Sequence, residues 1–114
     1  MKHNFRELNI WKESMELVKM VYNLTKQLPV EERFGLISQI NRSVISIPSN
    51  IAEGSGRTSE KELIYFLNIA ISSSYELETQ LILINEIYQV ENENIISKLN
   101  TLQKMIAGFK KTLS

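Results

Sequence analysis

The chain has 114 residues, one histidine, no cysteine, and a formal net charge of zero from 13 basic and 13 acidic side chains. Its length is typical of one domain, which is expected to span residues 1–114. Its composition is 43% hydrophobic and 23% charged, which is typical of a globular protein rather than a disordered or fibrous one. The lack of cysteine excludes disulfides, thiol catalysis and cysteine-type zinc sites. The sequence has neither an apolar run of about 20 residues nor a signal-peptide pattern, so a cytoplasmic protein without membrane association is expected.

Apolar residues with helical spacing run along the whole chain, and no stretch alternates long enough to predict a strand. In the first segment, apolar residues recur in steps of three and four over residues 8–28. Pro29 follows Leu28, and the residue before a proline is disfavoured in helical geometry. The first helix is therefore expected to end near Leu28.

The second helix is predicted over residues 31–53. Glu31 and Glu32 would lie in its first turn, where negative charge complements the helix dipole. Pro48 falls inside the apolar pattern, and because the pattern continues past it, a kink is favoured over a complete break. Gly54 is expected to end the helix in the left-handed conformation, which glycine adopts at little cost.

Two further helices complete the pattern. Ser59 and Glu62 form a capping box, which predicts a third helix over Glu60–Tyr88 that is apolar on much of its circumference. Asn92 or Asn94 is expected to cap a fourth helix. Four amphipathic helices joined by short turns predict an all-α, antiparallel up-down four-helix bundle, with the second helix kinked at Pro48.

Charge is unevenly distributed along the chain. Residues 1–30 have five basic and three acidic side chains, residues 58–93 have one against seven, and residues 94–114 have four basic and none acidic. In an up-down bundle the first and fourth helices are neighbours, so their lysines are candidate phosphate contacts in RNA or DNA; the alternative is a solvated face that keeps the protein soluble. The candidates are Lys12, Lys19, Lys26, Lys98, Lys104, Lys110 and Lys111.

A polar stripe marks the second helix. Its side chains share one side, away from the isoleucine stripe, and serve either as plain solvent surface or as a hydrogen-bonded seam against another helix. In the seam interpretation, Arg42 or Arg57 donates to carboxylates, and the candidate acceptors are Glu53, Glu76 and Glu78. The stripe consists of Gln39, Arg42, Ser46, Asn50 and Glu53.

The same region resembles the four-helix bundle protein family, also called the 23S rRNA-intervening-sequence protein family. The similarity covers nearly the whole chain, and its most diagnostic part is SIPSNIAEG at residues 46–54 followed by Gly56-Arg57. One departure is Ser72-Ser73, where the family often has glycine followed by serine. The positions taken from the family motif as structural or interface residues are Gln39, Arg42, Ser46, Pro48, Asn50, Glu53, Gly54, Arg57 and Glu76.

The resemblance implies a ring-like homo-oligomer, with a pentamer the expected form, and brings no established catalytic activity. Some family members are encoded inside insertions in 23S rRNA genes, and related bundle proteins that accompany diversity-generating retroelements are thought to bind nucleic acid through basic surfaces. The leading hypothesis is thus a non-enzymatic assembly protein whose partner is itself, and the alternative is nucleic-acid binding by the oligomer.

Catalytic patterns are weak by comparison. The chain has no aspartate, so no Ser-His-Asp triad can form, and no Glu-x-x-His pair is present for a di-iron site. The single histidine, His3, is expected near a mobile terminus. No cofactor, metal or small-molecule substrate is expected. A weaker hypothesis is an enzyme with glutamate chemistry in the region of Arg42–Glu53, and it requires a concave pocket with convergent polar groups.

Overall fold

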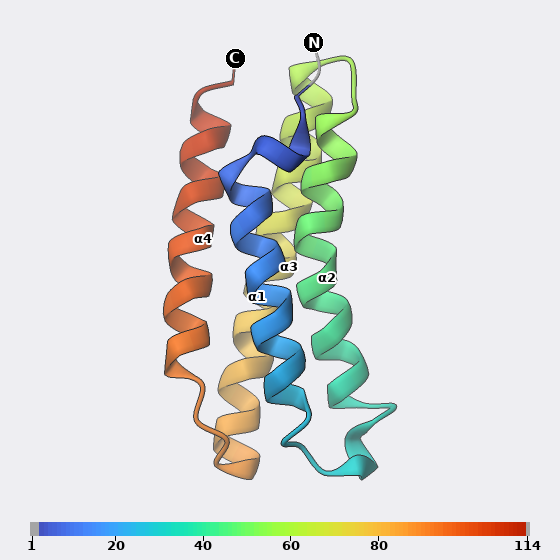
Figure 1. Cartoon of the computed structure of the whole chain (residues 1–114), viewed down its shortest axis with the longest axis vertical. Coiled ribbons are helices and arrows are strands. Elements are labelled where there is room, and N and C mark those ends of the chain that lie inside the picture. The colour runs from blue at the N-terminus through green and yellow to red at the C-terminus, as the bar shows by residue number, and fades with distance from the viewer. Residues whose placement is uncertain (1–2, 114) are drawn as a thin grey trace.

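Four long helices lie side by side in the computed structural model, which describes residues 3–113 (Figure 1). They are α1 (Asn9–Thr25), α2 (Leu36–Ser55), α3 (Glu60–Tyr88) and α4 (Glu93–Lys111), with short 3-10 turns η1 (Phe5–Glu7) and η2 (Val30–Glu32). Consecutive helices run in opposite directions, and no strand occurs over residues 3–113. The predicted all-α, antiparallel four-helix architecture is confirmed.

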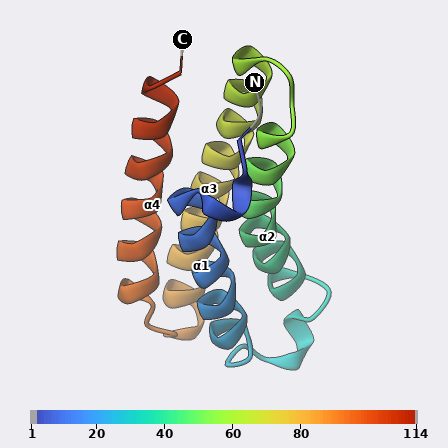
Figure 2. The ribbon, with the colours of Figure 1, turned by 45° about the horizontal axis from the view of Figure 1, so that its top comes forward.

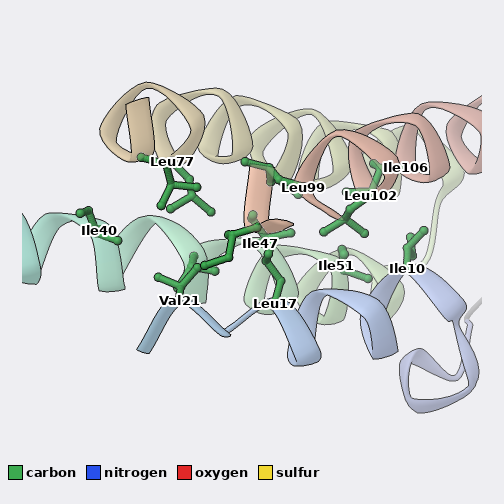
Figure 3. Packing of buried hydrophobic residues seen from close by; sticks show 14 of the residues in the cluster. Ile10, Leu17, Val21, Ile40, Ile47, Ile51, Leu77, Leu99, Leu102 and Ile106 are labelled. Atoms are coloured by element: carbon green, nitrogen blue, oxygen red, sulfur yellow. The ribbon is translucent and has the colours of Figure 1, made fainter. Parts of the chain in front are cut away.

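The helices form a closed cycle of contacts. Each packs against its neighbours in sequence, α1 also packs against α4, and the most extensive contact is between α2 and α3, whereas α4 has the least extensive contacts (Figure 2). All four contribute fully buried side chains to one core, among them Leu17, Ile40, Leu77 and Leu99 (Figure 3). Burying such side chains is the main favourable term in folding, and it follows from the three-to-four spacing of the sequence.

The connection between α1 and α2 differs from the prediction. Helix α1 ends at Thr25, and Glu31 and Glu32 belong to η2 rather than to the first turn of α2. Gly35, with φ −110° and ψ −110°, is outside helical geometry, so α2 begins only at Leu36. Glu32 still caps the start of α2 although it lies outside the helix, because its carboxylate accepts a hydrogen bond from the Leu36 amide at 3.3 Å.

Helix α2 continues through Pro48 to Ser55, so no break occurs at the proline, and the kink stays a prediction. The left-handed conformation predicted for Gly54 is wrong, because no described glycine has a positive φ and Gly54 is still helical. Its role is close packing instead: a Cβ built there would lie 2.8 Å from Cβ of Phe66 on α3. A side chain is excluded at this point, and glycine lets α2 approach α3.

The ends of α3 and α4 are fixed by side chains. As predicted, Ser59 Oγ accepts from the Glu62 amide at 3.1 Å; the Glu62 carboxylate accepts from the Ser59 hydroxyl at 3.3 Å rather than from the backbone amide of a complete capping box. Asn92 occupies the N-cap position of α4, but its side chain makes no capping bond. Its amide donates instead to the Leu81 carbonyl at 2.8 Å, which ties the connector back onto α3.

Tyr88 at the end of α3 donates its hydroxyl to the Glu32 carboxylate, and this bond raises the pKa of Tyr88 above its ordinary value of about 10. The bond favours the protonated phenol, so its contribution to stability is present below pH of about 10 and is lost as the pH rises through the raised pKa. Ultraviolet titration of phenolate should show a late-titrating tyrosine in the wild type that is missing from Tyr88→Phe. A Tyr22→Phe control, which removes an exposed phenol of α1, should retain it; its loss there would contradict the assignment.

Candidate functional site

The predicted basic residues of α1 and of its C-terminal cap, Lys26, share one exposed face. Lys12, Lys19 and Lys26 are spaced by seven residues, which keeps them on one side of a helix. Lys19 donates to the Glu16 carboxylate at 2.9 Å, and this hydrogen bond, together with the lysine's charge, lowers the pKa of Glu16. The α1 face is therefore basic, with one of its three charges partly compensated.

The predicted basic residues on α4 are divided between two seams. Lys98 donates to the Glu13 carboxylate of α1 at 2.5 Å, whereas Lys110 donates to Oδ1 of Asn68 on α3 at 2.9 Å. The structure therefore turns these two side chains toward opposite neighbours and does not align them on one ridge. Four lysines of the predicted set are exposed and have no hydrogen-bond or ion-pair partner among residues 3–113: Lys12, Lys26, Lys104 and Lys111.

The polar stripe of α2 meets α3 through hydroxyl groups. Ser46 Oγ and Ser73 Oγ lie 2.8 Å apart, and the Asn50 amide donates to both the carbonyl (2.8 Å) and the hydroxyl (2.9 Å) of Ser46. In the Ser72-Ser73 pair, Ser72 is exposed, so only Ser73 enters the seam. The structure thus places part of the stripe in a hydrogen-bonded seam.

Beside this seam lies a hollow of about 390 Å³ between α2 and α3. Arg42 and Glu76 stand on its two walls, both exposed, with no ion pair or hydrogen bond to another described residue. We call the hollow the α2–α3 groove, and its lining residues are Gln39, Arg42, Ser43, Ser46, Ser73 and Glu76. The enzyme hypothesis required such a concavity, but the groove holds one carboxylate and no histidine, and its two central hydroxyls bond to each other rather than to a base.

The remaining predicted carboxylate partners have other roles. Arg57 donates to Glu53 at 2.6 Å, a contact within one stretch of chain rather than between helices, and its guanidinium lies 4.8 Å from the centre of the Phe66 ring. Glu78 accepts from Asn100 at 3.2 Å and from Gln103 at 3.0 Å on α4. Of the three predicted acceptors, only Glu76 therefore lies in the groove.

The sequence did not predict the polar network between α3 and α4. Gln103 donates to Glu78 and also to Oγ of Ser74, which is fully buried, at 3.2 Å. A signal was present, since Ser74 and Glu78 are four residues apart on α3 and share a face. Their partners on α4 depend on the alignment of the two helices, which the spacing does not reveal.

His3, which was expected near a mobile terminus, packs against the bundle. Its backbone amide donates to the Ser55 carbonyl at 3.2 Å, and its ring packs edge-on against Phe109 at 5.6 Å between centroids. Its Nε2 is buried without a hydrogen-bond partner among the described residues. Over residues 3–113 there is no cluster of three or more His, Cys, Asp or Glu side chains able to hold a metal ion, and no helix there is long and apolar enough to span a bilayer.

One comparison with known proteins identifies the family of the chain. No curated protein matches the chain. A comparison with protein families matches residues 6–108 to the 23S rRNA-intervening sequence proteins, which takes in all of α1, α2 and α3 and most of α4. The matched range also contains the α2–α3 groove and the hydroxyl seam beside it. With four antiparallel helices and a match over nearly its whole length, the chain belongs to the 23S rRNA-intervening sequence protein family.

Proposed function

We propose that the chain is a non-enzymatic assembly protein that forms a ring-like homo-oligomer, with five copies the expected number. Unlike faces of identical subunits join into a ring when the rotation between them closes. The single observation that carries the proposal is the set of large apolar side chains left exposed on α3, which a neighbouring copy would cover.

These exposed apolar side chains are concentrated on one helix. Five of the exposed large apolar residues in the described chain belong to α3, whereas α4 has none. Ile87 is 54% exposed, and Leu83, one turn earlier, is 40% exposed. The α3 set consists of Tyr65, Tyr75, Ile82, Leu83 and Ile87.

Light scattering tests the assembly directly. The chain has a mass of 13.2 kDa, so five copies give about 66 kDa. We expect the double variant Leu83→Lys/Ile87→Lys to lower the mass toward 13.2 kDa, because two charges would be buried without partners at the interface.

The matched control adds two lysines with the same spacing to exposed polar positions of α4, Ser97→Lys/Thr101→Lys. It should retain the wild-type mass. A wild type that is monomeric at micromolar concentration, or a control that dissociates as readily as the α3 variant, would contradict the proposal.

Nucleic-acid binding by the oligomer is the second candidate. It is favoured by the exposed face that carries Lys12, Lys19 and Lys26, because a ring repeats that face once per copy and so raises the number of phosphates neutralised. The zero net charge of one copy does not oppose it, since the acidic side chains are concentrated in residues 58–93.

The lysines of α4 offer an internal comparison for this candidate. Lys104 is exposed without a partner, whereas Lys98 is paired with Glu13. We expect Lys104→Gln to reduce the slope of log affinity against log salt by about 1 for each copy in contact, and Lys98→Gln to reduce it less. Titrations of a labelled RNA hairpin and a DNA duplex over a series of salt concentrations measure both slopes; equal slopes for all three proteins would contradict the candidate.

A further inference from the structure

The α2–α3 groove carries opposite charges on its two walls. Arg42 on α2 and Glu76 on α3 both line it, yet no ion pair joins them. Elsewhere in the bundle, opposite charges on neighbouring helices do meet, as Lys98 and Glu13 do at 2.5 Å. The five-donor fork of Arg42 and the acceptor oxygens of Glu76 therefore remain available to a third group lying between them.

The groove also has a hydrogen-bonding hydroxyl pair at its centre. Ser46 and Ser73 share one hydrogen bond, so one of their two hydroxyl hydrogens is left to donate elsewhere. The Asn50 amide already donates to Ser46 Oγ and holds that side chain in place. The groove therefore presents one spare hydroxyl hydrogen, on Ser46 or Ser73, in addition to the two charges.

A buried acceptor lies further along the same side of α3. Gln80 follows Ser73 by seven residues, which places both on one face of the helix, and it comes one turn after Glu76. Gln80 is only 6% exposed, and its Oε1 has no hydrogen-bond partner among residues 3–113. A buried acceptor without a donor is costly, and the Gln80 oxygen is thus a second unpaired acceptor on the side of α3 that carries Glu76, although it lies beyond the groove lining.

We infer that the groove binds a small zwitterion, a free amino acid or a compound with the same two charges, with its carboxylate on Arg42 and its ammonium group on Glu76. The volume of about 390 Å³ falls within the range of about 300–1,000 Å³ common for small-molecule sites. A simple anion would be attracted by Arg42 but repelled by Glu76. A simple cation would be attracted by Glu76 but repelled by Arg42. Because both charged side chains are exposed, we expect dissociation constants on the order of 1 mM.

Thermal unfolding of the full chain tests this site. The probes are the standard amino acids, one at a time at millimolar concentration, with inorganic phosphate and methylamine as probes that carry one charge. At least one amino acid is expected to raise Tm by binding the folded state, and neither single-charge probe should do so. Arg42→Gln and Glu76→Gln should each abolish the shift, because each removes one of the two charged contacts.

Two matched controls change the same residue types outside the groove. Arg33→Gln and Glu86→Gln both replace exposed side chains and should preserve the Tm shift. No shift with any amino acid, a shift that survives both groove variants, or an equal shift with phosphate alone would overturn the proposal. It would also be overturned if the groove variants lowered the mass of the oligomer without affecting a Tm shift, because the groove would then be a contact between copies.

Discussion

Gly54→Ala is expected to lower the free energy of unfolding by about 1–2 kcal/mol. The added Cβ would lie 2.8 Å from Cβ of Phe66 and 3.0 Å from Cδ1 of Leu63, so α2 and α3 would have to move apart. Overpacking of this kind costs about 1–3 kcal/mol, and the higher helix propensity of alanine offsets up to about 1 kcal/mol. Urea unfolding at a fixed subunit concentration measures the difference.

Gly108→Ala is the matched control, because Gly108 is also helical but a Cβ built there has nothing within 4 Å. The free energy of unfolding of Gly108→Ala should rise by up to about 1 kcal/mol from helix propensity alone. The two glycine variants are therefore expected to shift the unfolding midpoint in opposite directions. A Gly54→Ala variant as stable as Gly108→Ala would mean that the close approach at Gly54 does not limit the packing of α2 on α3.

Ile47→Ala is expected to lower the free energy of unfolding by about 2–5 kcal/mol, because Ile47 is fully buried in the core. Truncation there removes apolar contacts and leaves a cavity. Ile45, two residues earlier in the same helix, is 41% exposed, and Ile45→Ala should cost less than about 1 kcal/mol. The intrinsic change in helix propensity is the same in both variants, so the difference between their unfolding free energies isolates burial. Equal losses in the two variants would show that this part of α2 is not ordered as described.

Most of the fold could be predicted from apolar spacing, and boundaries were accurate where a specific side-chain signal was present. The start of α3 follows from Ser59, whose hydroxyl oxygen accepts from the Glu62 amide as one half of the capping box, while the Glu62 carboxylate bonds to the Ser59 hydroxyl. The start of α2 was wrong because Glu31 and Glu32 suit a first turn equally well in a 3-10 helix. The pattern does not show that the backbone at Gly35 leaves helical geometry between them and α2.

The groove was predictable on its α2 wall, whereas on the α3 wall only Glu76 was a predicted partner. Gln39, Arg42 and Ser46 recur in steps of three and four, so their common face follows from the sequence. Which residues of α3 stand opposite depends on how far the two helices are offset along their axes. That offset is set by three-dimensional packing, such as the contact between Gly54 and Phe66, so Ser73 could not be assigned from spacing.

The unequal helix contacts have a consequence for partial unfolding. Helix α4 has the least extensive contacts with the rest of the bundle, and the contact between α2 and α3 is the most extensive. We therefore expect that less free energy is needed to detach α4 than to separate the other helices. Local opening is then expected to begin at the C-terminal helix, which would uncover part of the shared core, and hydrogen exchange is expected to be slowest in α2 and α3.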